Sequence, residues 1–141
     1  MKKFLFLLLP LCISCWRAQS PQVLGTERIL LYNSGEVVSQ GGVEDFASEE
    51  VFCLQNILGR VALKGHQTLI TYVPQLLFLS DGWTLDCHDT FLVLNLKRTK
   101  TAWMQLVYPL EQEEQAFFSR IKGRIKRRAT IGEMKNSFPQ E

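Results

Sequence analysis

The sequence has few of the residues that usually build catalytic and metal sites. Its 141 residues include two histidines, His66 and His88. No metal-ligand spacing is present, no glycine-rich phosphate loop opens a helix, and no serine lies in a nucleophile-elbow pattern. We therefore expect no catalytic residue, no metal and no cofactor, and predict that the protein is not an enzyme.

A long hydrophobic run and an excess of one charge are also missing. The apolar stretch Phe4–Ile13 is too short to cross a bilayer as a helix, which takes about 20 residues. The net charge of +2 comes from Lys2 and Lys3, so the chain beyond them is neutral overall. Overall charge gives no argument for nucleic acid as a partner, and a charged surface has to come from a local cluster.

The first residues have the layout of a secretory signal peptide. Lys2 and Lys3 precede the apolar stretch, and the small residue Ser14 follows it. We predict that residues 1–14 are a signal peptide and that the rest of the chain works outside the cytoplasm. Export also disfavours nucleic acid as a partner.

The same segment resembles the bacterial lipoprotein signal, in which a cysteine after a small residue becomes the lipidated N-terminus. Cys15 follows Ser14 in this way, while Cys12 stands where that family usually has leucine. The resemblance implies that lipid on Cys15 anchors the protein at the cell envelope. The alternative is plain cleavage near Ser14 or Ala18, which would release a soluble periplasmic or secreted protein.

Two cysteines remain beyond this segment, Cys53 and Cys87. In an oxidising compartment such a pair is a candidate disulfide, which would stabilise the fold by about 3–4 kcal/mol on the chain-entropy model. Two free, packed thiols are the alternative. Cys87 also lies in the cluster Asp86–Asp89, but neighbours along a strand point to opposite faces, so Cys87 and His88 would not form a catalytic pair.

Composition and pattern together predict one α+β domain. Residues 15–27 are polar and predict a tether, residues 28–128 the domain, and residues 129–141 a flexible tail. A helical period covers residues 43–58 and ends before Gly59, and a second helix is expected over 109–128.

The expected sheet is mostly antiparallel, with six to eight strands that could curl into a partial barrel. A hairpin is expected around residues 33–35, with a loop slightly longer than the minimal one. Period-two patterns predict six further strands: Arg60–Lys64, Gln67–Val73, Leu76–Ser80, Trp83–Cys87, Thr90–Leu96 and Ala102–Tyr108.

The dipeptide Asp81-Gly82 favours a two-residue turn, which pairs Phe78 with Leu85 and Leu76 with Cys87. The face that carries these four side chains is the more apolar one and is expected to face the core. Two later strands are apolar on both sides, so both faces of the sheet should be covered by helices, by barrel closure or by a partner.

The predicted C-terminal helix carries a basic face: Arg120, Arg124, Arg127 and Arg128. Such a face suits an anionic membrane surface or an acidic envelope protein, although a solvated helix end would have the same composition. We therefore predict a small exported binding or assembly module. The alternative is a carrier of an apolar ligand such as a lipid, in a curled sheet lined by Leu76, Phe78, Trp83 and Leu85.

Overall fold

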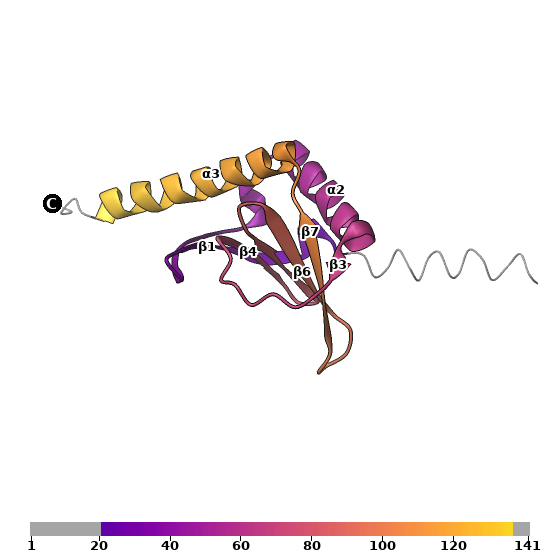
Figure 1. Ribbon diagram of the computed structural model, residues 1–141. Coiled ribbons are helices and arrows are strands. Elements are labelled where there is room, and N and C mark those ends of the chain that lie inside the picture. The colour runs from indigo at the N-terminus through magenta and orange to yellow at the C-terminus, as the bar shows by residue number, and fades with distance from the viewer. Residues whose placement is uncertain (1–20, 137–141) are drawn as a thin grey trace, which may run out of the picture.

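The computed structural model describes residues 21–136, with side chains described up to residue 128. A seven-stranded antiparallel sheet is covered on one face by two helices, which confirms the α+β prediction (Figure 1). In chain order the elements are η1 (Val23–Gly25), β1 (Thr26–Asn33), β2 (Glu36–Gly41), η2 (Val43–Asp45), α2 (Ser48–Lys64), β3 (His66–Gln67), β4 (Leu76–Ser80), β5 (Trp83–Cys87), β6 (Phe91–Lys97), β7 (Trp103–Pro109) and α3 (Gln112–Asn136).

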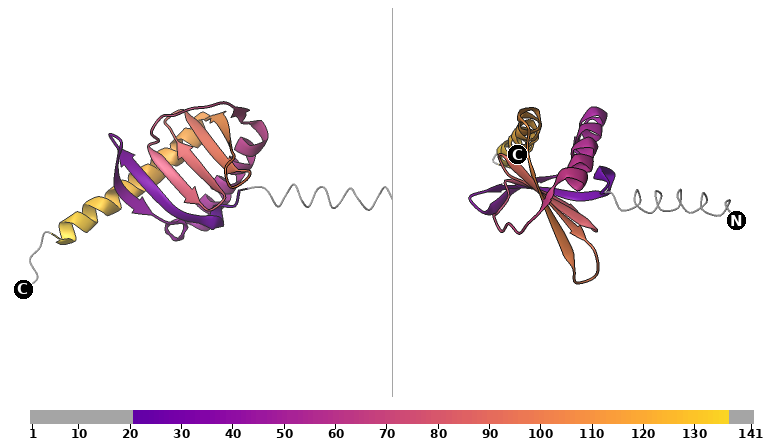
Figure 2. Two further views of the ribbon diagram at one scale, coloured as in Figure 1. Left: turned by 90° about the horizontal axis from the view of Figure 1, so that it is seen from below. Right: turned by 45° about the vertical axis from the view of Figure 1, so that its right-hand side comes forward.

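The sheet has the order β2-β1-β4-β5-β6-β7-β3, so β2 and β3 form its two edges. It is curled but open (Figure 2). The β4–β5 hairpin has the register that its Asp-Gly turn predicts, with Phe78 opposite Leu85 and Leu76 opposite Cys87. All four side chains are buried, as expected for the inner face.

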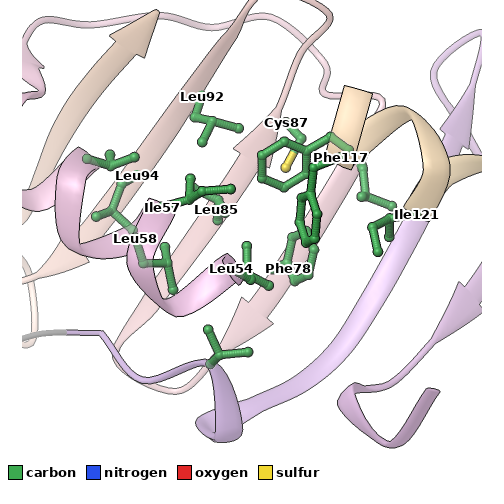
Figure 3. Close-up of a cluster of buried hydrophobic side chains, with 14 of the residues drawn as sticks. Leu54, Ile57, Leu58, Phe78, Leu85, Cys87, Leu92, Leu94, Phe117 and Ile121 are labelled. Atoms are coloured by element: carbon green, nitrogen blue, oxygen red, sulfur yellow. The ribbon is translucent and has the colours of Figure 1, made fainter. Parts of the chain in front are cut away.

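The core lies between this inner face and the two helices (Figure 3). Leu54, Ile57 and Leu58 of α2 and Phe117, Phe118 and Ile121 of α3 are almost completely buried. Phe78 lies in the middle, with its ring centroid 6.3 Å from Phe46 and 6.5 Å from Phe118. The buried hydrophobic residues of the described part of the chain extend from Val23 to Ile125.

A buried glutamate fixes the start of α3. The Glu114 carboxylate is 4% exposed and accepts hydrogen bonds from the Tyr108 hydroxyl at 3.1 Å and the Glu111 backbone N–H at 3.0 Å. Arg60 of α2 forms an ion pair with the same carboxylate at 3.1 Å. One side chain therefore joins α2, β7 and α3, and its negative charge lies in the first turn of α3, where the helix dipole favours it.

Helix α2 begins and ends later than the sequence predicts. Residues 43–45 form the short turn η2, and the helix runs through Gly59 to Lys64, so the predicted strand Arg60–Lys64 is wrong. A Cβ at Gly59 would meet nothing within 4 Å, so this glycine faces open space. A glycine inside a helix costs about 1 kcal/mol relative to alanine. Val61 adds another completely buried side chain to the core, which favours continuing the helix.

The predicted strand Gln67–Val73 is shortened to His66–Gln67. Beyond β3 the chain crosses the outer face of the sheet, opposite the helices, to reach β4 (Figure 1). The Gln105 side chain of β7 holds this crossing segment by bonding the backbone of Ile70: its amide donates to the carbonyl at 3.3 Å, and its oxygen accepts from the N–H at 2.5 Å.

Both predicted ends of the domain need correction. Val23 is completely buried and its N–H donates to Gln55 Oε1 at 2.9 Å, so the folded domain starts within the predicted tether 15–27. At the other end α3 continues to Asn136, through most of the predicted tail. The predicted signal peptide and Cys15 lie outside the described residues.

Candidate functional site

A groove of about 630 Å³ lies where the β1–β2 hairpin, the chain before β4 and the middle of α3 meet. We call it the hairpin–helix groove. Its lining residues are Leu31, Tyr32, Asn33, Ser34, Gly35, Val38, Val73, Pro74, Gln75, Lys122, Gly123 and Lys126. Among the side chains that the structure describes they include two lysines and no acidic residue, so this part of the groove combines positive charge with an apolar wall.

Lys122 is held in position on the α3 side of the groove. Its ammonium donates hydrogen bonds to Gln75 Oε1 and, at 3.2 Å, to Asp89 Oδ1. A hydrogen bond from Gln75, followed by the hydrogen bond and charge of the Lys122 ammonium, lowers the pKa of the Asp89 carboxyl, so this group is ionised at neutral pH. Because Asp89 is 70% exposed, water screens it, and the lysine keeps part of its positive field over the groove.

The opposite wall is the tip of the β1–β2 hairpin. Ser34 and Gly35 have φ angles of 51° and 83°, which is the left-handed backbone that a two-residue turn of type I′ requires. The loop is therefore the minimal one, shorter than the sequence predicts. A bulge interrupts the pairing after Leu31, where Val38 is the additional residue of β2. It bends the hairpin and places Val38 in the groove wall.

The predicted arginine face lies on another side of α3, and half of it binds the protein itself. The Arg124 guanidinium donates to both carboxylate oxygens of Glu50 at 2.7 Å, and Arg128 pairs with Asp45. Arg120 and Arg127 are exposed. The arginines thus do not form one docking surface, because Arg124 and Arg128 join α3 to η2 and α2.

The groove lysines were not predicted as site residues. Lys122 and Lys126 are four residues apart and therefore neighbours on one helix side, while Arg124 lies between them in sequence and points elsewhere. The sequence could have shown this, because the lysine and arginine positions fall on different sides of the predicted helix. The sequence could not predict that residues 73–75 form a groove wall, because their pattern is that of a strand end and the turn after it.

Cys53 and Cys87, the candidate disulfide pair, are both free thiols in the structure, which is the packed-thiol alternative. Cys87 lies on the inner face of β5 beside Phe117 (Figure 3). Helix α2, which carries Cys53, packs on β6, β7 and η1 instead. Burial raises the pKa of the Cys87 thiol well above its usual value, so the sulfur is a protonated packing group.

The two histidines lie apart. His66 is on the edge strand β3, whereas His88 follows β5, three strand spacings or about 14 Å away. The His88 ring stacks on Phe91 with centroids 4.3 Å apart, and burial lowers the pKa of the imidazole, which is therefore neutral at pH 7. Within the described part of the chain, no group of three or more His, Cys, Asp or Glu residues is arranged to hold a metal ion.

A half-buried acid lies on the outer face of the sheet. Asp86 of β5 stands between Leu77 and Val93 of the neighbouring strands. Burial raises the pKa of its carboxyl, against the effect of hydrogen bonds from Asn95 and Thr84. Asn95 also accepts a hydrogen bond from Gln105 at 2.9 Å, so a polar row leads from Asp86 to the crossing segment.

No helix in residues 21–136 is long and apolar enough to cross a membrane. Comparisons of the chain with models of protein families, with curated proteins and with solved structures found no match.

Proposed function

We propose that the protein is an exported, lipid-anchored protein of the bacterial envelope that binds an acidic segment of a partner protein and catalyses no reaction. Export and the lipid on Cys15 follow from the N-terminal sequence pattern alone. The observation that carries the binding function is the hairpin–helix groove, whose lining, among the side chains described up to residue 128, has two lysines, an apolar wall and no acidic side chain.

The charges of the groove specify an anionic ligand. Lys122 and Lys126 lie four residues apart on α3, which places their Cβ atoms about 5–6 Å apart. One carboxylate can therefore contact both ammonium groups. Each such contact at a partly exposed site contributes at most about 1 kcal/mol. The pair thus selects a negatively charged ligand, and the apolar wall supplies further binding energy.

The shape of the groove suits a short extended segment. Its volume of about 630 Å³ is within the range of about 300–1,000 Å³ that is usual for ligand sites. Leu31, Val38, Val73 and Pro74 form the apolar part of the lining. A segment that alternates acidic and apolar side chains would place its carboxylates on the lysines and its apolar groups on this wall.

The carrier hypothesis has less support. The four residues that would line its cavity, Leu76, Phe78, Trp83 and Leu85, are buried in the core. Side chains of α2 and α3 pack on the face that would hold the ligand (Figure 3). A lipid in that place would have to displace both helices.

The groove can be blocked without disturbing the core. Gly123 lines the groove, and a Cβ built on it would meet nothing within 4 Å. The variant Gly123→Trp should therefore fold and fill the groove. Gly59→Trp is the matched control, because Gly59 is also a helical glycine with nothing within 4 Å and lies on α2.

The experiment measures binding of fluorescent hexapeptides that alternate Glu with Leu, by anisotropy, with Lys-Leu peptides as the comparison. We expect the acidic peptide to bind, and the double variant Lys122→Gln with Lys126→Gln to bind about 10-fold more weakly. Gly123→Trp should abolish binding, while Gly59→Trp and Arg127→Gln should leave it unchanged. Equal binding to Gly123→Trp would show that the groove is not the site.

A further inference from the structure

Helix α2 has an apolar side that faces away from the core. Phe52 and Leu63 are 69% and 70% exposed. They are about three helical turns apart, so they lie on one side of the helix, separated by about 16 Å along its axis. Leu54 and Val61, which are completely buried, lie on the opposite side. The exposed apolar side chains of α2 therefore contribute nothing to the core of the domain.

Two further residues complete this exposed side. Asn56 and Gly59 lie between Phe52 and Leu63 on the same side of α2, and we call these four residues the α2 stripe. A Cβ built on Gly59 would meet nothing within 4 Å, so the middle of the stripe is low and open. A second backbone can approach closely at such a glycine.

The stripe has an apolar neighbour in the turn η1. The Val23 N–H donates to Gln55 Oε1 at 2.9 Å, and the Gln55 amide donates to the Pro21 carbonyl at 2.9 Å, so η1 lies beside α2. Leu24 in this turn is 78% exposed. Apolar side chains that are exposed close to one another mark contact surfaces more often than scattered ones do.

Opposite charges stand at the two ends of the stripe. Glu49 near the start of α2 and Lys64 at its end are both exposed. Helical geometry places both to the same side of the stripe, about 60° and 120° around the helix from Phe52. Neither forms an ion pair with the side chains that the structure describes up to residue 128. This side of α2 is therefore negative at one end and positive at the other.

We propose that the α2 stripe binds the α2 stripe of a second copy of this chain, with the two helices antiparallel about a two-fold axis. Such an axis brings the same side of both helices together, running in opposite directions. With Phe52 opposite Leu63 of the second copy, Asn56 lies opposite Gly59, where the missing side chain makes room. Each apolar end of the stripe is then covered by the other copy.

The order of the charges selects this orientation and this occupant. In this register Glu49 of each copy lies within about 3 Å along the axis of Lys64 of the other, so two symmetry-related ion pairs can form. Parallel helices would instead place like charges together. An anionic membrane surface would attract Lys64 but repel Glu49, whereas a second copy pairs both.

Dimerisation through α2 is separate from ligand binding in the hairpin–helix groove. The lining residues of the groove come from the β1–β2 hairpin, the chain before β4 and α3. A dimer formed through α2 uses none of them and carries two grooves. Failure of the peptide to bind the groove would leave dimerisation intact, and the reverse also holds.

The test measures energy transfer between copies of the full chain that carry a donor or an acceptor dye on a C-terminal tag. A non-ionic detergent keeps a lipid-anchored form in solution, and a large excess of micelles prevents copies from sharing a micelle by chance. An interface of one helix and one turn from each copy is at the small end of the size range for specific complexes. We therefore expect a dissociation constant of about 1–100 µM.

The first variant removes the apolar groups of the stripe. Phe52→Gln with Leu63→Gln should weaken dimerisation more than about 100-fold, because four apolar side chains of the dimer are lost. Leu69→Gln with Tyr72→Gln is the matched control, since these side chains of the crossing segment are 88% and 72% exposed, and it should leave dimerisation unchanged. All four positions are exposed, so both variants should fold, which circular dichroism checks.

Charge reversal tests the antiparallel register. Glu49→Lys leaves two lysines on this side of α2 and Lys64→Glu leaves two glutamates, so each variant alone should dimerise about 10-fold more weakly than the parent. An equimolar mixture of the two restores both ion pairs and should dimerise as tightly as the parent. The proposal would be overturned by an absence of energy transfer at about 100 µM chain, by equal losses in the apolar variant and its control, or by a mixture no tighter than the single variants.

Discussion

The Glu50–Arg124 ion pair gives the sharpest test of how α3 is fixed. Both guanidinium donors are 2.7 Å from the carboxylate oxygens, and the side chains are 19% and 35% exposed for Glu50 and Arg124. Exposed ion pairs contribute about 0.2–1 kcal/mol, and well-formed hydrogen bonds to charged groups about 1.5–3 kcal/mol. For this bidentate, partly exposed pair we expect a coupling energy of about 1–2 kcal/mol.

A double-mutant cycle isolates that coupling. Glu50→Gln keeps an oxygen that can accept from the Ala47 N–H, as Glu50 does at 3.1 Å, and Arg124→Met keeps the apolar stem. Urea unfolding gives the free energy of unfolding of each variant and of the double variant. Arg127→Met, which removes an exposed arginine, is the control and should change stability by less than about 0.5 kcal/mol.

The coupling should also depend on pH. Arg124 lowers the pKa of the Glu50 carboxyl in the folded protein from its ordinary value of 4.5, so the unfolded chain binds the proton more tightly. The stabilisation is therefore complete above about pH 4.5 and declines as pH falls below it. A coupling below about 0.3 kcal/mol at pH 7 would be within the scatter of additive effects and would refute the reasoning. Arg124 would then be able to bind a partner.

Two further predictions concern buried chemistry. In a chain that begins at residue 19, and so lacks Cys12 and Cys15, Ellman's reagent should modify Cys53 in the folded protein and Cys87 only after unfolding. The reason is that Cys87 is 2% exposed and burial raises the pKa of its thiol. If the unfolded, unreduced protein had no reactive thiol, the two cysteines would form a disulfide. Asp86→Asn should raise the free energy of unfolding at pH 7 by up to about 1 kcal/mol, because it removes a half-buried charge and keeps the hydrogen-bond acceptor. Since burial raises the Asp86 pKa, this gain should shrink as pH falls towards 3.8, and a gain unchanged at low pH would contradict the assignment.

Local patterns predicted the parts of the fold that depend on neighbours in sequence. The two-residue turn at Asp81-Gly82 determines the register of β4 and β5 without reference to the rest of the chain. The end of α2 was different, because a glycine usually stops a helix and only burial of Val61 in the assembled core makes continuation favourable. The strand predicted after Gly65 was lost for a similar reason, since Gln105, 35 residues away, holds Ile70 on the outer face.

The basic face of α3 was predicted from the sequence, but the ion pairs that Arg124 and Arg128 form within the protein were not. The helix position of Arg124 is evident from the sequence, whereas its partner Glu50 is 74 residues away and becomes a neighbour only in the folded chain. Charge that a long-range partner neutralises looks the same in sequence as charge that faces solvent. The groove could not be predicted for the same reason, because the β1–β2 turn and α3 are far apart in sequence and become neighbours only in the folded chain.

Helix α3 comes last among the elements of residues 21–136, yet it supplies Phe117, Phe118, Ile121 and Ile125 to the interior. A nascent polypeptide that has not reached these residues would leave the inner face of the sheet uncovered. The domain thus cannot complete its fold until residues 117–125 have been synthesised. Before that point the apolar side chains of β4 and β5 would be open to solvent or to another apolar surface.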